Sequence, residues 1–211
     1  MEIEAFVLIG GKSSRMGRDK ALIKLDGITL AERAANTIST ALSPKQIYFV
    51  AVSKDQFTGG DLPANIPVIY DQYKDRGAYG GLHAALSATK SEWIFVLACD
   101  LPFVSAELLK IMAGLISENF AAVVPLQQDG WAQPLCAFYR SEQCLKIVEK
   151  MLRADEKLPP LQAIFDQAKT RCSGSIFWSR GLTRKSLRNE APSFGTMYLR
   201  SITSHSLVSK T

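Results

Sequence analysis

Five short apolar runs recur along the first 125 residues, and each is bounded by polar or glycine-containing segments. Runs of this length are typical of strands that are buried on both faces of a parallel sheet. They predict strands over residues 5–9, 46–52, 67–70, 93–98 and 121–125. Because ligands in open α/β sheets bind outside the carboxyl ends of the strands, the glycines and aspartates that follow these runs are candidate site residues.

Longer segments between these runs predict helices over residues 30–42, 80–89 and 105–117. Thr29 lies three residues before Glu32, which is the spacing of a capping box and marks the start of the first helix. Strands that alternate with helices predict βαβ units. The pattern therefore favours an α/β fold of three layers, with helices on both faces of a mostly parallel sheet.

The alternation becomes looser after residue 125. We predict a strand, a helix and a shorter helix, over residues 132–139, 141–152 and 158–168. From residue 173 the chain is rich in serine and threonine, and its apolar positions show only weak periodicity. We therefore expect a single domain over residues 1–172 and a basic, loosely packed tail over residues 173–211.

The formal net charge of +5 is concentrated in this tail, since the basic residues beyond residue 173 outnumber the acidic ones by that amount. The rest of the chain is balanced, so we expect no nucleic acid partner. The sequence has no apolar run of eighteen residues and no secretory signal pattern, and its four scattered cysteines form no C-x-x-C pair. These features predict a cytoplasmic protein with no membrane partner and no zinc site.

The loop after the first predicted strand carries the main candidate chemistry. Gly10 and Gly11 allow backbone N–H groups to approach a ligand closely, and Ser13 adds a hydroxyl donor. Arg15 and Lys20 add two positive charges. The spacing fits neither the P-loop, nor the dinucleotide fingerprint, nor the nucleophile elbow of hydrolases. The combination predicts an anion-binding cradle that suits a polyphosphate.

Two carboxylates follow later strands of the predicted sheet. Asp100 ends the fourth strand before a turn at Pro102, and it suits Mg²⁺, which one or two carboxylates and substrate phosphates usually hold. Asp71 ends the third strand, where it either assists the metal, contacts a substrate, or simply forms a turn. Gly80 and Gly81 follow and leave room for a nucleobase or for an acceptor.

Histidine is scarce, with only His83 and His205 in the chain, and no Ser–His or Cys–His catalytic pair is evident. We expect His83 to have a surface or packing role. Phosphoryl chemistry can proceed without such a pair, because it depends mainly on positioning and charge neutralisation.

Residues 8–20 resemble the L-x-G-G-x-S-x-R-M-G-x-D-K signature of the molybdenum cofactor guanylyltransferases, the MobA family. Asp71, the glycine-containing loop 77–82 and the segment 99–103 occur in the same order as later motifs of that family. The pair Gln133-Pro134 resembles a segment near the family's acceptor site. The resemblance covers about residues 5 to 140.

The resemblance implies a nucleotidyltransferase-type fold, in which the first half of the sheet is Rossmann-like and binds a nucleotide. It also implies an enzyme that transfers GMP from GTP to the molybdopterin (Mo) cofactor, with Mg²⁺ and release of pyrophosphate. Molybdoenzymes or other proteins of the cofactor pathway would then be partners.

The resemblance further implies roles for individual residues. The catalytic residues would be Arg15, Lys20 and Asp100, of which Asp100 would bind the metal. The nucleotide would contact Leu8, Ile9, Gly10, Gly11, Ser13, Lys20, Asp71 and Asp100. The acceptor would contact Gly80, Gly81 and Gln133.

The sequence departs from the family pattern at two places. Many members carry asparagine at the end of the second strand, where this chain has Ala51-Val52-Ser53, and the closing N-x-N-T-P-E segment is absent. Two alternatives therefore stay open. One is a cytidylyltransferase or a sugar-phosphate nucleotidyltransferase of the same fold, and the other is a non-catalytic nucleotide-binding module.

Overall fold

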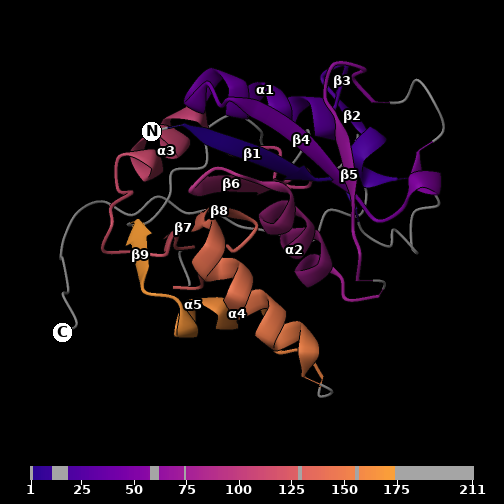
Figure 1. Cartoon of the computed structure of the whole chain (residues 1–211). Helices are drawn as coiled ribbons and strands as arrows, with labels where there is room; N and C mark the ends of the chain where they lie inside the picture. Colours follow the sequence, from indigo (N-terminus) through magenta and orange to yellow (C-terminus); the bar gives the residue numbers. More distant parts are fainter. Residues whose placement is uncertain are drawn as a thin grey trace.

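A seven-stranded sheet forms the centre of the described part of the molecule, with strand order β5-β4-β1-β6-β8-β7-β9 (Figure 1). The computed structural model describes residues 2–10, 19–57, 62–73, 75–127, 130–154 and 157–173. The strands of the sheet are β1 (Ile3–Leu8), β4 (Gln46–Ala51), β5 (Val68–Tyr70), β6 (Trp93–Ala98), β7 (Ala122–Pro125), β8 (Cys136–Arg140) and β9 (Thr170–Ser173). A short hairpin of β2 (Lys24–Leu25) and β3 (Ile28–Thr29) lies apart from this sheet.

The sheet is mostly parallel, as predicted. Strand β1 pairs in parallel with β4 on one side and with β6 on the other, and among the described strands of this sheet only β8 runs antiparallel to its neighbours. All six residues of β6 are buried. Burial on both faces explains why these strands read as continuous apolar runs rather than as alternating ones.

Helices cover both faces of the sheet and give the three predicted layers (Figure 1). Helices α1 (Leu30–Leu42) and α3 (Ala106–Ala113) pack together on one face, where their apolar side chains meet one set of strand side chains. Helices α2 (Ala78–Ala88), α4 (Ser141–Arg153) and α5 (Ile164–Gln167) pack on the other face against the alternate set. Each face therefore has its own apolar core.

The predicted helix starts are confirmed by their capping geometry. The side-chain oxygen of Thr29 accepts a hydrogen bond from the N–H of Glu32 at 3.1 Å. Ser105 accepts one from the N–H of Leu108 at 3.2 Å. Both hydroxyls satisfy N–H groups that have no partner within the helix, which fixes where α1 and α3 begin.

Three predicted boundaries were wrong. The helix predicted over residues 105–117 ends at Ala113, because the chain turns at Gly114. The strand predicted over 132–139 begins only at Cys136, after a turn at Pro134 and Leu135. The helix predicted over 158–168 is shorter and divided, with a 3₁₀ turn at Leu161–Ala163 before α5. Strand β9 was not predicted, and its last residue, Ser173, is the first residue assigned to the tail.

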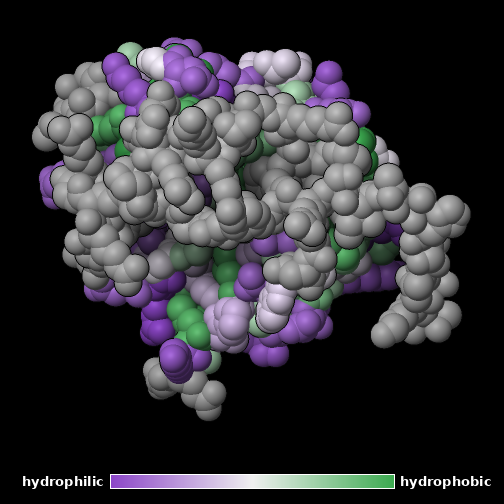
Figure 2. Space-filling view, turned by 180° about the vertical axis from the view of Figure 1, so that it is seen from behind, coloured by the Kyte–Doolittle hydropathy of each residue, from purple (hydrophilic) through white to green (hydrophobic). Residues whose placement is uncertain are grey.

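The described surface is largely polar on the face that Figure 2 shows, where hydrophobic residues form small, separate patches. No helix among the described residues is both long enough and apolar enough to cross a bilayer.

Candidate active site

The order of the strands creates a switch point between β1 and β6. The chain proceeds from β1 to β4 and β5 on one side, and it then returns to place β6 on the other side of β1. A crevice outside the carboxyl ends of two such strands is the usual ligand site in open α/β sheets. Gly10 follows β1 and Asp100 follows β6, and the N–H of Cys99 donates to the carbonyl of Leu8 at 3.1 Å. The switch point therefore brings the two main sequence motifs together.

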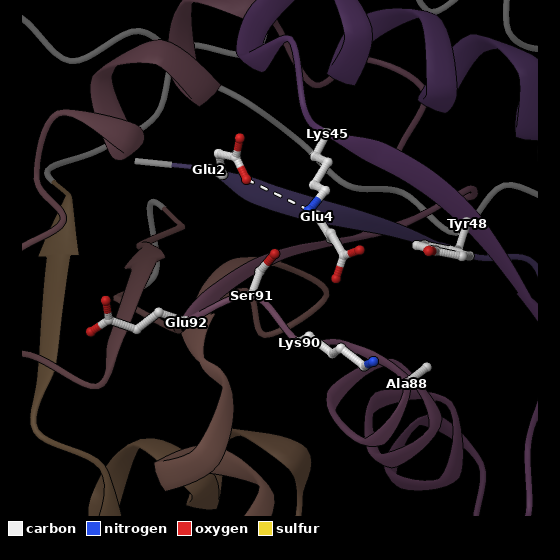
Figure 3. A pocket seen from close by; sticks show the side chains of 8 residues that line it. All are labelled: Glu2, Glu4, Lys45, Tyr48, Ala88, Lys90, Ser91 and Glu92. Atoms are coloured by element: carbon white, nitrogen blue, oxygen red, sulfur yellow. Dashed lines mark ion pairs between the residues drawn. The ribbon is translucent and has the colours of Figure 1, made fainter.

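A polar hollow of about 550 Å³ lies at the opposite edge of the sheet (Figure 3). Its walls include Glu2, Glu4, Lys45 and Tyr48, which precede or begin β1 and β4, and Lys45 pairs with Glu2 at 3.6 Å. None of the residues that line it belongs to the sequence-predicted site. The position of the sheet's carboxyl edge, rather than this hollow, therefore identifies the candidate site.

Lys20 and Asp100 form an ion pair at the switch point, although 80 residues separate them in the sequence. The Lys20 Nζ atom lies 3.5 Å from Asp100 Oδ2, and the two side chains are 48% and 42% exposed. Lys20 begins a 3₁₀ turn, Lys20–Leu22, whose cap is Asp19. Both charges are open to solvent, so an incoming phosphate and its cation can reach them.

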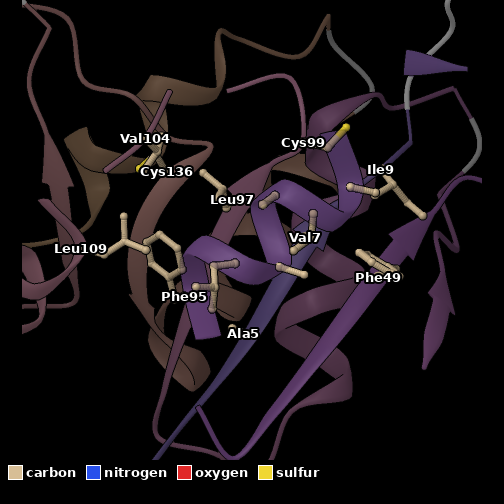
Figure 4. Packing of buried hydrophobic residues seen from close by; sticks show 14 of the residues in the cluster. Ala5, Val7, Ile9, Phe49, Phe95, Leu97, Cys99, Val104, Leu109 and Cys136 are labelled. Carbon is tan, nitrogen blue, oxygen red and sulfur yellow. The ribbon is translucent and has the colours of Figure 1, made fainter. Parts of the chain in front are cut away.

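Leu8 and Ile9 lie at the end of β1, directly before the predicted cradle. Their side chains are 7% and 2% exposed, and those of Ile9 and Cys99 lie in the core between the sheet, α1 and α3 (Figure 4). Gly10 is exposed, and a Cβ atom there would lie only 2.7 Å from a methyl carbon of Val52. A larger residue at position 10 would therefore require Val52 to shift, because the chain leaves β1 close to the end of β4.

Three predicted cradle residues, Gly11, Ser13 and Arg15, lie outside the described residues. Their roles remain predictions.

Asp71 is held beside Gly80. Its Oδ1 atom accepts a hydrogen bond from the N–H of Tyr73 at 2.7 Å, and its own N–H donates to the carbonyl of Ala51. A Cβ atom at position 80 would lie 2.2 Å from Asp71 Oδ2. Burial raises the pKa of the Asp71 carboxyl, while the Tyr73 N–H and His83 act in the opposite direction. The structure thus places Asp71 against α2 at Gly80, one of the glycines that follow Asp71 in the sequence.

Gly81 and Gln133 occupy two different parts of this edge. Gly81 faces inward, where a Cβ atom would be in ordinary contact with the side chain of Leu8 at 3.5 Å. Gln133 lies in the turn before β8, and its side-chain oxygen accepts a hydrogen bond from the N–H of Leu135 at 3.4 Å. The carbonyl of Leu135 in turn accepts from Ala98, at the end of β6. Gln133 is therefore on the same edge of the sheet as Asp100.

Gln56 is a further residue of the candidate site, and the sequence did not predict it. It ends a 3₁₀ turn, Lys54–Gln56, that follows β4. Its side chain bonds to Ile9, to Val52 and to Asp19, which belong to three separate segments. The motif of the cradle contains Asp19, but nothing in the local sequence around Gln56 indicates that this side chain reaches it.

His83 and Cys99 have packing roles rather than catalytic ones. His83 is 5% exposed and packs edge-on against Tyr73, with ring centroids 4.7 Å apart. Burial lowers its pKa, although Glu149 and Asp71 act to raise it. Burial raises the pKa of the Cys99 thiol to about 12, so the reactive thiolate is disfavoured. Among the described residues, no three histidine, cysteine, aspartate or glutamate side chains gather into a metal-binding group.

The three-layer α/β fold carries a lysine and a carboxylate at its switch point, which are the charges that a phosphate-bearing ligand and its cation would need at the usual ligand site of such sheets. The chain belongs to the MobA-like NTP transferase family, whose domain model matches residues 5–170. It is therefore a nucleotidyltransferase, and the resemblance noted in the sequence is confirmed.

Individual relatives agree with this assignment. The molybdenum cofactor guanylyltransferase of Desulfosudis oleivorans is 31% identical over 170 residues, which cover 80% of this chain and 79% of the relative. A probable molybdenum cofactor guanylyltransferase of Nostoc sp. is 35% identical over 146 residues, or 68% of each chain. The crystal structure of the molybdopterin-guanine dinucleotide biosynthesis protein A of Archaeoglobus fulgidus has a TM-score of 0.62. It covers 90% of this chain and 87% of its own, and at 24% identity it supports the fold.

Proposed function

We propose that this enzyme transfers GMP from GTP to the molybdopterin (Mo) cofactor, producing the guanine dinucleotide cofactor and pyrophosphate. The observation that carries the proposal is the pairing of Lys20 with Asp100, 3.5 Å apart at the switch point of the sheet. The relatives of this chain, which are named molybdenum cofactor guanylyltransferases, support the choice of both substrates.

The proposed reaction needs charge neutralisation more than it needs a base. A terminal phosphate oxygen of the acceptor forms a bond to the α-phosphorus of GTP, and the bond from that phosphorus to the bridging oxygen breaks. The electron pair leaves with pyrophosphate. The attacking oxygen is already anionic, so no strong general base is required. Lys20, together with Arg15, would neutralise the charge that develops on the triphosphate.

Asp100 suits Mg²⁺ because its carboxylate is 42% exposed and lies 3.5 Å from Lys20, which would contact the phosphates. One carboxylate and several phosphate oxygens form a common Mg²⁺ environment. When bound, the cation would act as a Lewis acid and as a template. Asp71 and Gly10 would line the nucleotide, and Gly80, Gly81 and Gln133 would face the acceptor.

The proposal is tested by incubating the enzyme with GTP, Mg²⁺ and molybdenum-loaded molybdopterin, and by measuring pyrophosphate and the dinucleotide product. We expect both products with GTP and little with CTP, ATP or UTP. Turnover with CTP alone would overturn the guanine assignment. That outcome is worth testing because Val52, which follows β4 and is 42% exposed, has an apolar side chain that cannot hydrogen-bond to a base. Nucleotide binding without any product would favour a binding module instead.

The roles of the ion pair give the first prediction. Lys20→Ala and Asp100→Ala should each lower turnover by at least ~10²-fold, a loss typical of removing one stabilising group from a reaction of this kind. Lys45→Ala is the matched control, because the Lys45–Glu2 pair has nearly the same N–O distance, 3.6 Å, and lies on the opposite edge of the sheet. Near-normal turnover in either active-site variant would contradict the mechanism.

A further inference from the structure

The carboxamide of Gln56 joins three segments that are far apart in the sequence. Its Oε1 atom accepts a hydrogen bond from the N–H of Val52 at 2.7 Å. Its Nε2 atom donates to the carbonyl of Ile9 at 3.0 Å and to Oδ2 of Asp19 at 2.6 Å. A primary amide has two N–H donors, and both have a partner here.

The partners of Gln56 stand on either side of the cradle loop in the sequence. Ile9 comes directly before the loop, at the end of β1, and Asp19 is the last residue before Lys20. Val52 belongs to the chain that leaves β4. One side chain therefore connects the residues before and after the loop to a third segment, the chain that leaves β4.

Asp19, which Gln56 binds, is connected to the Lys20–Asp100 ion pair through the backbone of the turn that follows it. The other carboxylate oxygen of Asp19, Oδ1, accepts a hydrogen bond from the N–H of Ala21 at 3.0 Å, which caps the turn that Lys20 begins. Lys20 then extends to within 3.5 Å of Asp100. Asp19 thus caps the turn that orients Lys20 with one carboxylate oxygen, and Gln56 holds the other oxygen by a hydrogen bond.

Glutamine is the residue type that this arrangement needs. The site requires one acceptor for the Val52 N–H and two donors, one of them for a carboxylate, where the hydrogen bond is charge-assisted and strong. Glutamate would keep the acceptor but would place a second negative charge against Asp19 and the carbonyl of Ile9. Alanine would leave all three partners without this side chain.

We propose that Gln56 is a positioning residue that holds both ends of the cradle loop and thereby directs Lys20 toward the triphosphate. The inference rests on the proposed nucleotidyl transfer, since it assigns Gln56 to the same site. Gln56 itself touches neither Asp100 nor Lys20 through any of its three hydrogen bonds, so its effect on activity passes through Asp19.

The first test compares Gln56→Ala with Gln46→Ala. Gln46 lies at the opposite end of β4 and donates a single hydrogen bond to the carbonyl of Ile47 at 2.8 Å, so it controls for the loss of a glutamine amide. We expect kcat/KM of Gln56→Ala to fall by roughly 10- to 100-fold, because small displacements of positioning groups have effects of this size. Gln46→Ala should stay within about twofold of the unsubstituted enzyme, as expected for a residue away from the site. Equal activities of the two variants would overturn the proposal.

The second test separates positioning from general destabilisation by a double-mutant cycle with Lys20→Ala. If Gln56 acts by directing Lys20, the loss caused by Lys20→Ala should be at least fivefold smaller in the Gln56→Ala background, since the lysine is already misdirected there. A purely structural role predicts losses that multiply. Independent, multiplicative losses would therefore contradict the proposal even if Gln56→Ala were impaired.

The third test uses Gln56→Glu. Its carboxylate should repel Asp19, and protonation should restore one donor, so its kcat/KM relative to the unsubstituted enzyme should rise as the pH falls. A flat ratio would contradict the proposal. The same variants are compared for binding of GTP with Mg²⁺ by calorimetry, where the cycle in Kd should show the same coupling. If the unsubstituted enzyme forms no dinucleotide, the proposed function fails, whereas an uncoupled binding cycle rejects the role of Gln56.

Discussion

At the scale of a single residue, the burial of the candidate site residue Asp71 opposes the stability of the folded protein. Its carboxylate is partly buried against Gly80, and burial raises its pKa in the folded protein. The folded state therefore binds a proton more readily than the unfolded chain does. The free energy of unfolding therefore falls as the pH rises from the ordinary pKa of aspartate toward the raised pKa of Asp71. This loss of stability persists at neutral pH, where the carboxylate is charged.

Asp71→Asn should therefore stabilise the protein near pH 7 while weakening GTP binding. The asparagine oxygen can still accept the hydrogen bond from Tyr73, and no charge is buried. Since the group stays partly solvated, we expect a gain of about 0.5 kcal/mol, or ~1–2 °C in Tm. The gain should disappear at pH values below the ordinary pKa of aspartate, where both side chains are neutral. Thermal melts across pH 3 to 8 would check this, and a gain that grows at low pH would contradict it.

Gly80 and Gly81 offer a matched pair within one helix. Replacing glycine by alanine inside a helix usually contributes about 0.5–1 kcal/mol of stability. Gly81→Ala should show this gain, because its Cβ would meet Leu8 at an ordinary distance of 3.5 Å. In Gly80→Ala the Cβ would lie 2.2 Å from Asp71 Oδ2, so the carboxylate must leave its bond to Tyr73. Denaturant titrations should place Gly80→Ala below Gly81→Ala by at least ~1 kcal/mol, and the reverse order would refute the argument.

At the scale of the element, the sequence predicted the buried strands and the capped helices well. Continuous apolar runs such as the one that became β6, Trp93–Ala98, have a single compatible environment, and hydroxyl caps mark helix starts chemically. Strand β9, Thr170–Ser173, could not be predicted, because three of its four residues are partly or fully exposed and leave no apolar pattern. It is a strand because β7 offers it a parallel partner, which is a tertiary cause.

Helices α2 and α4 meet at His83, whose burial gives the pair a pH dependence. Burial lowers the pKa of His83 from its ordinary value of 6.5, against the opposing effect of Glu149, 3.9 Å away on α4, and of Asp71. The unfolded chain therefore binds a proton more readily than the folded protein does. Stability from the neutral imidazole is complete above pH 6.5 and is lost as the pH falls from there toward the lowered pKa.

His83→Gln should remove this component. The difference in unfolding free energy between the unsubstituted protein and the variant should favour the unsubstituted protein most above pH 7 and shrink as the pH falls to 5. Urea titrations at pH 5, 6, 7 and 8 measure it directly. A difference that does not change with pH would show that His83 titrates alike in both states.

At the scale of the whole molecule, the site is an outcome of topology rather than of any one segment. The sequence predicted that Lys20 and Asp100 would lie together, because both follow strands that meet at one edge of a parallel sheet. It could not predict Gln56, whose partners Asp19 and Ile9 lie 37 and 47 residues away, since such hydrogen bonds appear only when β1 and β4 are in register. The motif predicts the chemistry, whereas the contacts of Gln56 with Ile9 and Asp19 become visible only in the folded chain.

The limit of the folded unit gives the last prediction. Strand β9 pairs with β7 from Ala122–Thr170 to Pro125–Ser173, and the carbonyl of Lys169 accepts from Ala121 at 2.7 Å. The first three residues of β7 are fully buried, so without β9 their N–H and carbonyl groups would lose partners in a water-poor environment. With several hydrogen bonds at ~0.5–1.5 kcal/mol each, a chain ending at residue 168 should be about 3 kcal/mol less stable than one ending at 173. For a protein of this size that is ~6–12 °C in Tm. We expect the chain ending at 173 to melt cooperatively near the temperature of the full chain, as a dispensable tail requires. If both shortened chains melted alike, β9 would not belong to the folding unit, and if both failed to fold, the tail itself would be needed for folding.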